Sequence, residues 1–594
     1  MNPRLETMPE SQAVTAVGKL RRIDVGVSAY LLAVTIVLSN MDLRQALSYT
    51  VAGLLVGAIS FIVWRHRGWS WGIAGAISIA LALLTDFDQL PEMWSGRRIT
   101  LGTAAALLGL LGLISRRWIF SLVLTAFLLA TVWIASLTKF EYLGAPLIWH
   151  DVLVGIRSWD LFLEVETGKA AIFLVLLLMF PLLWRLESAA RLRTTLVSSL
   201  LLGLVAITFL HKAEMPDQNN LLEMSFNPDF SKHLVDPVAV LLGSIWNIGS
   251  LRPPPGLEVS NVACCLRANR AAEKLDSIPG QLPHIVVVLM ESSFDPATMQ
   301  GELGGKFFPD SYPLRIHTIG GSTWVAEYDL LHGVASPLYG PAFQAINLLG
   351  PGEADGRLPM ILRSAGYATT TIYPVAGRFY GARTFHRSLG MESFIDCLEV
   401  PGCMGHVWQD RPDHLFLDKA MDVLAHAAAP QFIFLPTIQQ HSPHDIKEVG
   451  AGATAPCRLL PIQCRVMREY RRRLDNSLVD YSRFKDQVQA LERETIVLTF
   501  GDHIPADVNR YFENKYFTAG RKQTFFTVWH SRRGYMTAEL MRRAGAPPYL
   551  DAAYLDWVLA AAAGLDSKYF RYKEAMIRRC AGEYCASAPK EAIQ

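Results

Sequence analysis

The sequence predicts an N-terminal α-helical transmembrane bundle of about seven spans, followed by an α/β domain with a doubly wound, mostly parallel sheet. Two observations lead to this prediction. Long apolar segments occur only before residue 212, and from about residue 283 short apolar runs alternate with polar helical stretches. With 594 residues the chain is too long for one compact domain, and its 19% of charged residues is low for a soluble protein.

The predicted spans approach the roughly 20 apolar residues that cross a bilayer core. They cover residues 25–41, 47–64, 69–85, 100–114, 118–137, 171–184 and 195–211. A polar, basic tail precedes the first span and no small-residue cleavage site follows it, so we expect this span to remain as an anchor.

Basic residues in the connecting loops predict the orientation of the bundle, because cytoplasmic loops are enriched in Lys and Arg. They gather in alternate loops, with Arg97 and Arg98 as an exception on the other side. The residues concerned are Lys19, Arg21, Arg22, Arg65, Arg67, Arg116, Arg117, Arg185, Arg191 and Arg193. An odd number of spans then places everything after Lys212 outside the cytoplasm.

The cysteines also favour an oxidising compartment for the second half of the chain. All 8 lie there, and three close pairs, 397/403, 457/464 and 580/585, suit short disulfide loops better than free buried thiols. No pair has the Cys-x-x-Cys spacing typical of zinc sites. The formal net charge of +2 and the absence of a basic patch interleaved with aromatic residues give no indication of nucleic-acid binding.

Three domains follow from this organisation: a transmembrane domain over 1–212, an interfacial helix and linker over 213–280, and an α/β domain over 281–594. Within the middle region, the apolar stretch Pro237–Ile248 predicts a helix lying along the membrane face, or equally an ordinary connecting helix. The run from Arg252 to Gly256 contains three prolines and reads as a stiff linker.

Four apolar runs in the α/β domain predict strands buried on both faces: Ile285–Met290, Thr369–Tyr373, Phe432–Leu435 and Thr495–Phe500. Helical stretches intervene at Leu358–Ala365 and 466–493. Because ligands bind beyond the carboxyl ends of strands in such sheets, the residues that follow each strand are candidates for a site.

The strand ends carry residues suited to metal binding. Glu291 follows the first strand, His441 and His444 follow the third, and Asp502 and His503 follow the fourth. Each has an ordinary alternative, since an acidic residue after a strand is often a helix N-cap. Taken together, hard oxygen and imidazole ligands from distant positions indicate a zinc or manganese site.

The segment GGSTWVAEYDLLHG at 320–333 adds two adjacent hydroxyls, Ser322 and Thr323, with Glu327 further on. Alone, a glycine-led turn with Ser and Thr is common loop material. Beside a predicted metal site, either hydroxyl becomes a candidate nucleophile, and the two glycines allow close backbone approach to a phosphate.

Five motifs together resemble the alkaline phosphatase/sulfatase superfamily: VVVLMES at 286–292, GGST followed by Glu327, HRSLGMESFID at 386–396, QQHSP at 439–443 and FGDH at 500–503. The chain is most similar to the membrane-anchored phosphotransferases of that superfamily, namely lipoteichoic acid synthases and bacterial phosphoglycerol and phosphoethanolamine transferases. The segment from Lys139 to Leu147, with Asp151 after it, also resembles a loop of their membrane domain.

The resemblance implies a metal site and a nucleophile. It implies one divalent ion, Mn²⁺ or Zn²⁺ with Mg²⁺ as a further candidate, held by Glu291, Thr323, Asp502 and His503. Thr323 would be the nucleophile, activated by the metal, and Ser322 a neighbour that contacts the phosphoryl group.

It further implies substrate-binding residues. His441 would act near the substrate phosphate, Arg383 or alternatively Arg378 would contact that phosphate, and Trp408, Asp410 and His444 would line the same edge.

The resemblance also implies a reaction. No Cys/Ser-x-Pro-x-Arg motif occupies the nucleophile position, which disfavours sulfate ester hydrolysis. Met-Glu-Ser at 290–292 is closer to the enzymes that transfer phosphoglycerol than to the Gly-Glu-[ST] of phosphoethanolamine transferases acting on lipid A.

We therefore expect an enzyme of the bacterial inner membrane with its catalytic domain in the periplasm. It would move a phospholipid head group to a glycan or a lipid-linked acceptor. Phosphoethanolamine transfer, phosphodiester hydrolysis and an inactive scaffold or binding protein are the alternatives.

Overall fold

The computed structural model describes residues 93–143, 146–149, 151–152, 177–178, 180–211, 236–246, 275–295, 299, 308–337, 358–406, 411–444, 461–512, 516–517 and 520–584. The chain divides into two compact units. One comprises 1–136, 159–216 and 234–243, and the other comprises 137–158, 217–233 and 244–594.

The first unit contains the apolar helices predicted to cross the membrane. In the described part of the chain, three helices are long and apolar enough to span a bilayer: α4 (Met93–Ser115), α5 (Trp118–Leu143) and α9 (Leu192–His211). They correspond to the predicted spans 100–114, 118–137 and 195–211. The predicted spans 25–41, 47–64 and 69–85 lie outside the described residues, and 171–184 is described only in part, so a total of seven is not established.

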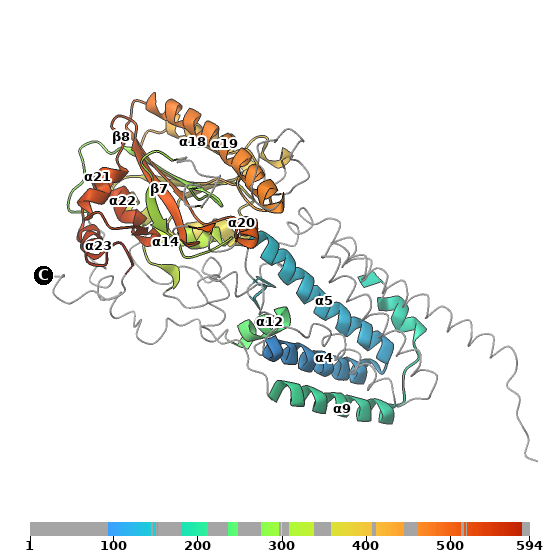
Figure 1. Ribbon diagram of the computed structural model, residues 1–594. Coiled ribbons are helices and arrows are strands. Elements are labelled where there is room, and N and C mark those ends of the chain that lie inside the picture. Colours follow the sequence, from blue (N-terminus) through green and yellow to red (C-terminus); the bar gives the residue numbers. More distant parts are fainter. Residues whose placement is uncertain are drawn as a thin grey trace, which may run out of the picture. The chain divides into compact units, whose positions relative to one another are not determined.

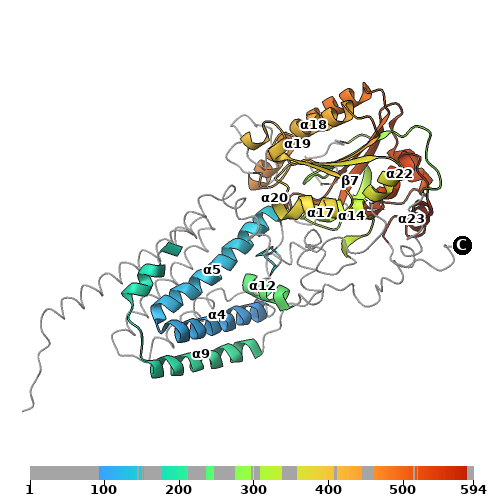
Figure 2. The same cartoon turned by 180° about the vertical axis from the view of Figure 1, so that it is seen from behind.

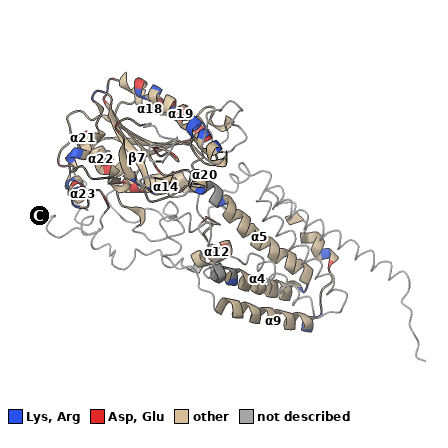
Figure 3. Cartoon of the chain, in the orientation of Figure 1, with Lys and Arg blue, Asp and Glu red and all other residues tan. Residues whose placement is uncertain are grey.

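Helices α4 and α9 pack through small residues. Gly109 approaches Leu202, and the Ser199 hydroxyl donates a hydrogen bond of 2.9 Å to the Gly109 carbonyl. Small side chains allow this close approach, which favours helix association in membranes. Charged side chains are scarce along these helices and plentiful on the helices around the sheet (Figure 3).

The apolar stretch predicted as a helix at Pro237–Ile248 forms α12 (Pro237–Trp246). Asp236 begins it, since its Oδ1 accepts hydrogen bonds from the amides of Val238 and Ala239. This is the N-cap arrangement that satisfies the first free amides of a helix. The helix is thus confirmed, while its orientation along a membrane face stays a prediction.

Among the described residues, the second unit is built around a nine-stranded sheet of order β4-β3-β5-β1-β6-β7-β2-β9, with β8 paired to β7. Figures 1 and 2 show helices on either side of this sheet. Strands β4, β3, β5, β1 and β6 run parallel, and β7 is antiparallel to both β6 and β2. The strands are β1 (His284–Met290), β2 (Tyr312–Arg315), β3 (Ala368–Tyr373), β4 (Ser393–Asp396), β5 (Gln431–Pro436), β6 (Thr495–Gly501), β7 (Gln523–His530), β8 (Gly534–Tyr535) and β9 (Leu550–Asp551).

All four predicted strands are present and form the neighbouring strands β3, β5, β1 and β6 of this sheet. The sheet is mixed and mostly parallel, and a core covers each of its faces. Along β1, Ile285 and Val287 point into one core and Val286 and Val288 into the other. Such two-sided burial explains why these strands are continuous apolar runs without alternation.

Helices cover both faces of the sheet. The core that contains Ile285 includes residues of α14 (Thr323–His332), α16 (Leu358–Ser364), α17 (Ala382–Ser388), α21 (Thr537–Arg543), α22 (Leu555–Ala562) and α23 (Lys568–Arg579). The core that contains Val286 includes residues of α18 (His414–Ala425), α19 (Pro461–Gln489) and α20 (Ala506–Tyr511). Short 3₁₀ turns occur at η4 (Phe379–Gly381), η5 (Cys397–Glu399), η6 (Cys403–Gly405) and η9 (Ala552–Tyr554).

Candidate metal centre and nucleophile

Glu291, Asp502 and His503 meet at the carboxyl edge of the sheet. Strands β1 and β6 are parallel neighbours in the register Met290↔Gly501, so the residues that follow each strand emerge side by side. One ligand atom from each of the three side chains lies within 4.8 Å of the others, and all three are buried. The structure therefore brings together three of the four ligands that the resemblance implied.

The backbone around this cluster is tightly constrained. A Cβ atom on Gly501 would lie 1.9 Å from the Ser293 carbonyl oxygen, so only glycine fits where the two strand ends meet. Ser292 adopts a positive φ of 52°, a strained conformation for a non-glycine residue that is common at functional sites. Its amide donates a hydrogen bond of 2.7 Å to Oδ1 of Asp502, which fixes that carboxylate.

The polar atoms at the centre of the cluster suit a cation. Oδ2 of Asp502 and Nε2 of His503 are buried and have no hydrogen-bond partner among the described residues. They lie 3.1 Å apart, and Nε2 lies 3.3 Å from Oε1 of Glu291. Burial and the Glu291 charge raise the pKa of the Asp502 carboxyl. Buried polar atoms without a hydrogen-bond partner are costly, and a divalent cation would satisfy both of them while also binding Glu291.

Thr323 is the first residue of α14 and faces this cluster. Its hydroxyl donates a short hydrogen bond to Oε2 of Glu291. The other nine residues of the helix are buried, whereas Thr323 is partly exposed. Ser322 precedes it with a positive φ of 66°, and the amide of Gly320 donates to the carbonyl of Ile504, which ties the GGST turn to the segment after His503.

His441 lies near the same cluster, in the loop after β5. Its Nδ1 is 2.5 Å from the Ser442 carbonyl oxygen, which can only accept, so Nδ1 carries a proton and Nε2 faces Oε1 of Glu291 at 4.0 Å. Burial lowers the pKa of His441. Since β5 is the other neighbour of β1, the sheet order explains how His441 reaches Glu291.

Several polar residues hold the His441 loop, and two of them were not predicted from the sequence. Arg473 of α19 donates to the carbonyls of His441 at 3.0 Å and Pro443 at 3.4 Å. Asp507 accepts from the Ser442 hydroxyl and from the amide and Nδ1 of His444. His444 therefore points its Nδ1 to Asp507, within the loop that carries His441. Neither Arg473 nor Asp507 lies in a recognisable motif.

Arg383, the preferred candidate for phosphate binding, is engaged elsewhere. Its guanidinium pairs with Asp396 at 2.8 Å and Glu399 at 2.9 Å and also donates to the Phe394 carbonyl. The structure does not bring Arg383 into the cluster around Glu291. The alternative Arg378 is exposed, and Trp408 and Asp410 lie outside the described residues.

Glu327, one turn after Thr323, lies in the core rather than in the cluster. Its Oε2 is 3.2 Å from Nε2 of His386, and both side chains are fully buried. His386 in turn lies 3.3 Å from the Thr371 hydroxyl of β3. Glu327 thus connects the helix of Thr323 to the neighbouring part of the sheet.

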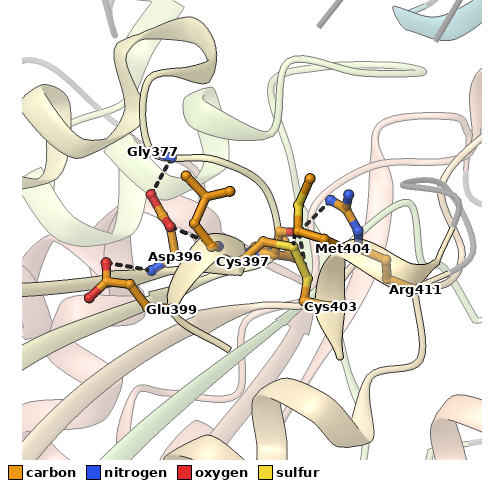
Figure 4. Close-up of a disulfide and its surroundings, with 9 residues drawn as sticks. Gly377, Asp396, Cys397, Glu399, Cys403, Met404 and Arg411 are labelled. Atoms are coloured by element: carbon orange, nitrogen blue, oxygen red, sulfur yellow. Dashed lines mark hydrogen bonds between the residues drawn. A yellow bond between two sulfur atoms is a disulfide. The ribbon is translucent and has the colours of Figure 1, made fainter. Parts of the chain in front are cut away.

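The predicted disulfide between Cys397 and Cys403 is present (Figure 4). It closes a short loop after β4, where Arg411 donates a hydrogen bond of 2.9 Å to the Pro374 carbonyl. Cys464 and Cys580 are also disulfide-bonded, and their predicted partners Cys457 and Cys585 lie outside the described residues. These bonds agree with the oxidising compartment expected from the cysteine spacing.

Comparisons with known proteins give one family match and two curated relatives. Residues 315–529 match the sulfatase family model. A putative cyclic β-1,2-glucan modification protein of Rhizobium meliloti is 23% identical over 301 residues, which are 44% of this chain and 46% of that protein. An uncharacterized protein of Haemophilus influenzae is 25% identical over 187 residues, 28% of this chain and 33% of that protein. The chain thus matches less than half the length of either relative.

Two solved structures are partly similar to this chain. The lipooligosaccharide phosphoethanolamine transferase EptA of Neisseria meningitidis is an integral membrane protein with 13% identity and a TM-score of 0.46, covering 87% of this chain and 95% of that chain. The phosphoglycerol transferase GacH of Streptococcus pyogenes, in complex with sn-glycerol-1-phosphate, has 12% identity and a TM-score of 0.41, covering 58% of this chain and 91% of that chain.

Proposed function

Because residues 315–529 of this chain match the sulfatase family model, we propose that the protein is a metal-dependent phosphotransferase of the cell envelope. It moves the phosphorylated head group of a membrane phospholipid, phosphoglycerol in the first instance, to a glycan. The transfer proceeds through a phosphodiester on Thr323. The observation that carries this proposal is the Thr323 hydroxyl bonded to Glu291, beside the buried carboxylate and imidazole of Asp502 and His503.

The three side chains fit a divalent cation by their chemistry, since carboxylate and imidazole ligands suit Mn²⁺ or Zn²⁺, and Mg²⁺ where carboxylates dominate. Glu291, Asp502 and His503 would hold it, with the Thr323 oxygen as a further ligand. When bound, such a cation lowers the pKa of a ligating hydroxyl and offsets negative charge on phosphoryl oxygens.

The protein groups then have separate tasks. Glu291 accepts the Thr323 hydrogen bond and aims Oγ1, which attacks the head-group phosphorus. A bond forms between Oγ1 and phosphorus, and the bond from phosphorus to the diacylglycerol oxygen breaks. The Thr323 proton passes to a base, for which Nε2 of His441 is the candidate, and the diacylglycerol oxygen takes up a proton and leaves as an alcohol. In the second step the acceptor hydroxyl attacks the same phosphorus, the bond from phosphorus to Oγ1 breaks, and Oγ1 regains a proton as the acceptor hydroxyl loses its own. His441 Nε2, held toward Glu291, exchanges protons with the departing and entering oxygens or binds a phosphoryl oxygen.

The membrane part of the chain supports a lipid donor. Helices α4, α5 and α9 are long enough to anchor the protein in a bilayer, where phospholipids are available. The basic loops favour an orientation in which the catalytic domain lies on the periplasmic side of the inner membrane. The name of the Rhizobium meliloti relative refers to glucan modification, which makes a periplasmic glucan a candidate acceptor.

Phosphoethanolamine is the second candidate head group, because the attack on phosphorus is the same for either donor. Hydrolysis would replace the acceptor hydroxyl by water. A non-catalytic scaffold is disfavoured, since pseudo-enzymes usually lose metal ligands and all four positions are filled here.

The proposal is tested by release of diacylglycerol from fluorescent phosphatidylglycerol or phosphatidylethanolamine in detergent micelles. Thr323→Ala should lower the rate by at least about a thousandfold, because it removes the nucleophile. Ser322→Ala is the matched control and should retain most of the activity. Full activity in Thr323→Ala with loss in Ser322→Ala would show that the nucleophile is the neighbouring hydroxyl.

A further inference from the structure

We propose that the C-terminal segment 550–579, which lies beyond the family match, positions the nucleophile Thr323 by clamping α14 at two points. The inference rests on the proposed function, because it assigns a role to residues that act on Thr323 through its helix. The segment contacts α14 at two points. The Lys573 ammonium binds the carboxyl end of α14, and the Asp551 carboxylate is linked to the middle of α14 through His317.

The first contact joins α23 to the end of α14. Nζ of Lys573 donates hydrogen bonds to the carbonyls of Gly333 at 2.7 Å and Ala553 at 2.6 Å, and to Oδ2 of Asp556 at 2.6 Å. All three donors of the ammonium are therefore used, and the Lys573 and Asp556 side chains are 4% and 0% exposed. The Tyr569 hydroxyl also donates to Oδ2 of Asp556.

Gly333 shows how closely this contact fits. It ends α14 with a φ of 71°, and a Cβ atom there would lie 2.3 Å from the Tyr569 hydroxyl and 2.4 Å from Oδ2 of Asp556. Glycine is required both for the left-handed cap and for the approach of Lys573. The end of the helix is thus held by a directed ammonium contact in addition to the apolar core that α14 shares with α22 and α23.

The second contact lies one turn earlier. Nδ1 of His317 is 2.7 Å from Oδ2 of Asp329 on α14, and Nε2 is 3.0 Å from Oδ2 of Asp551 on β9. Asp329 is fully buried, and its Oδ1 accepts the amide of Ser336 just after the helix. His317 therefore links α14 to β9 by a short Asp–His–Asp bridge.

These buried charges indicate a role in positioning in addition to any contribution to stability. Burying ionised groups costs solvation energy, and apolar residues of similar volume often give equal or greater stability. Directed ionic bonds instead select one arrangement of the elements they join. Because α14 is a ten-residue helix, about 15 Å long, fixing its middle and carboxyl end fixes Thr323 at its amino end. A displacement of about 1 Å at a reacting group can lower a rate about a hundredfold.

The test compares Lys573→Met with Arg571→Met in the full-length protein in detergent. Arg571 lies on the same helix and also forms two ion pairs, with Asp566 and Asp276, but its side chain is 50% exposed. Amide hydrogen exchange is followed in chelator-treated protein, and formation of the Thr323 adduct from phosphatidylglycerol is followed in single-turnover experiments. Asp551→Asn tests the second contact, and Lys573→Met with Asp556→Asn removes both charges of the first.

If the clamp positions α14, Lys573→Met, Asp551→Asn and the double variant should each show faster amide exchange than wild type in peptides covering 323–333. Amide exchange in peptides from β1 and β5 should be unchanged. The clamp also predicts that adduct formation slows by about tenfold to a hundredfold at saturating donor, with little change in the donor concentration at half-saturation. Arg571→Met should leave both readouts within about twofold of wild type, as expected for an exposed ion pair.

The proposal would be overturned if a folded variant showed unchanged amide exchange in 323–333. It would also be overturned if exchange in β1 and β5 accelerated as much as in 323–333. The double variant decides the matter if Lys573→Met does not fold. If wild type forms no adduct, the proposed function fails, while the exchange measurement still decides whether the clamp exists.

Discussion

The Thr323 hydroxyl donates a hydrogen bond to the Glu291 carboxylate across 32 positions of sequence. Thr323 begins a helix on one side of the sheet and Glu291 follows its central strand β1, so this contact exists only in the folded domain. It joins the candidate nucleophile to the candidate metal site.

Asp502→Asn and His503→Ala should each abolish tight metal binding, because each removes a buried ligand atom that has no hydrogen-bond partner among the described residues. Purified wild-type protein should contain about one Mn²⁺ or Zn²⁺ per chain by elemental analysis, and each variant much less. Adding the metal to chelated wild type should raise its Tm, with no such rise in either variant.

Asp422→Asn, which changes an exposed carboxylate, is the control and should bind metal normally. Metal content at the wild-type level in both ligand variants would contradict the site.

Gly501→Ala should destabilise the protein strongly, because the added Cβ would lie 1.9 Å from the Ser293 carbonyl. Overpacking of this kind costs at least about 1–3 kcal/mol. Gly280→Ala is the comparison, since a Cβ there meets nothing within 4 Å. Thermal unfolding of both variants checks this, and equal melting temperatures would show that the strand ends are less closely packed than described.

Arg473→Met should lower turnover by about tenfold or more while the protein stays folded, because the carbonyls of His441 and Pro443 lose their donor. Arg472→Met is a close control: Arg472 also pairs with Glu469, but its side chain is 47% exposed. We expect Arg472→Met to be within about twofold of wild type. Equal turnover in the two variants would remove Arg473 from the positioning of His441.

The His317 bridge should make stability depend on pH above neutrality. Burial alone would lower the pKa of His317, but the Asp551 and Asp329 carboxylates raise it to about 10. Because this value lies above the ordinary 6.5, the bridge contributes fully below about pH 6.5 and is lost as the pH rises toward 10. Lys573 lies near the same carboxylates, and burial lowers its pKa.

The measurement is the Tm of full-length wild type and His317→Gln between pH 6 and 10. Wild type should lose stability more steeply than the variant across this range. Parallel curves would mean that His317 is not a buried cation.

Much of the sheet could be predicted because its central strands are continuous apolar runs. The apolar runs at β1, β3, β5 and β6 predicted these strands and drew attention to the residues that follow them, including Glu291, Asp502 and His503. The antiparallel strands β7 and β8 and the short strands β2, β4 and β9 were not predicted. At two to four residues, β2, β4, β8 and β9 are too short to show a pattern.

The supporting residues of the site were harder to predict. Arg473 lies in a run of three arginines, and only the packing of α19 distinguishes it from its exposed neighbour Arg472. The resemblance implies an arginine somewhere between residues 378 and 387, with Arg383 as the preferred candidate, yet Asp396 and Glu399 engage Arg383 in the structure. Long-range partners such as Asp507 for His444 depend on the fold and leave no local signal in the sequence.

The most direct test of the central claim is mass spectrometry of peptides from the protein after incubation with phosphatidylglycerol in the absence of acceptor. We predict an added mass equal to glycerol phosphate less water, located on Thr323 and absent from Thr323→Ala. With phosphatidylethanolamine, the corresponding ethanolamine phosphate increment would identify the other head group. Diacylglycerol release by wild type with no adduct on Thr323, or with the adduct on Ser322, would contradict the account.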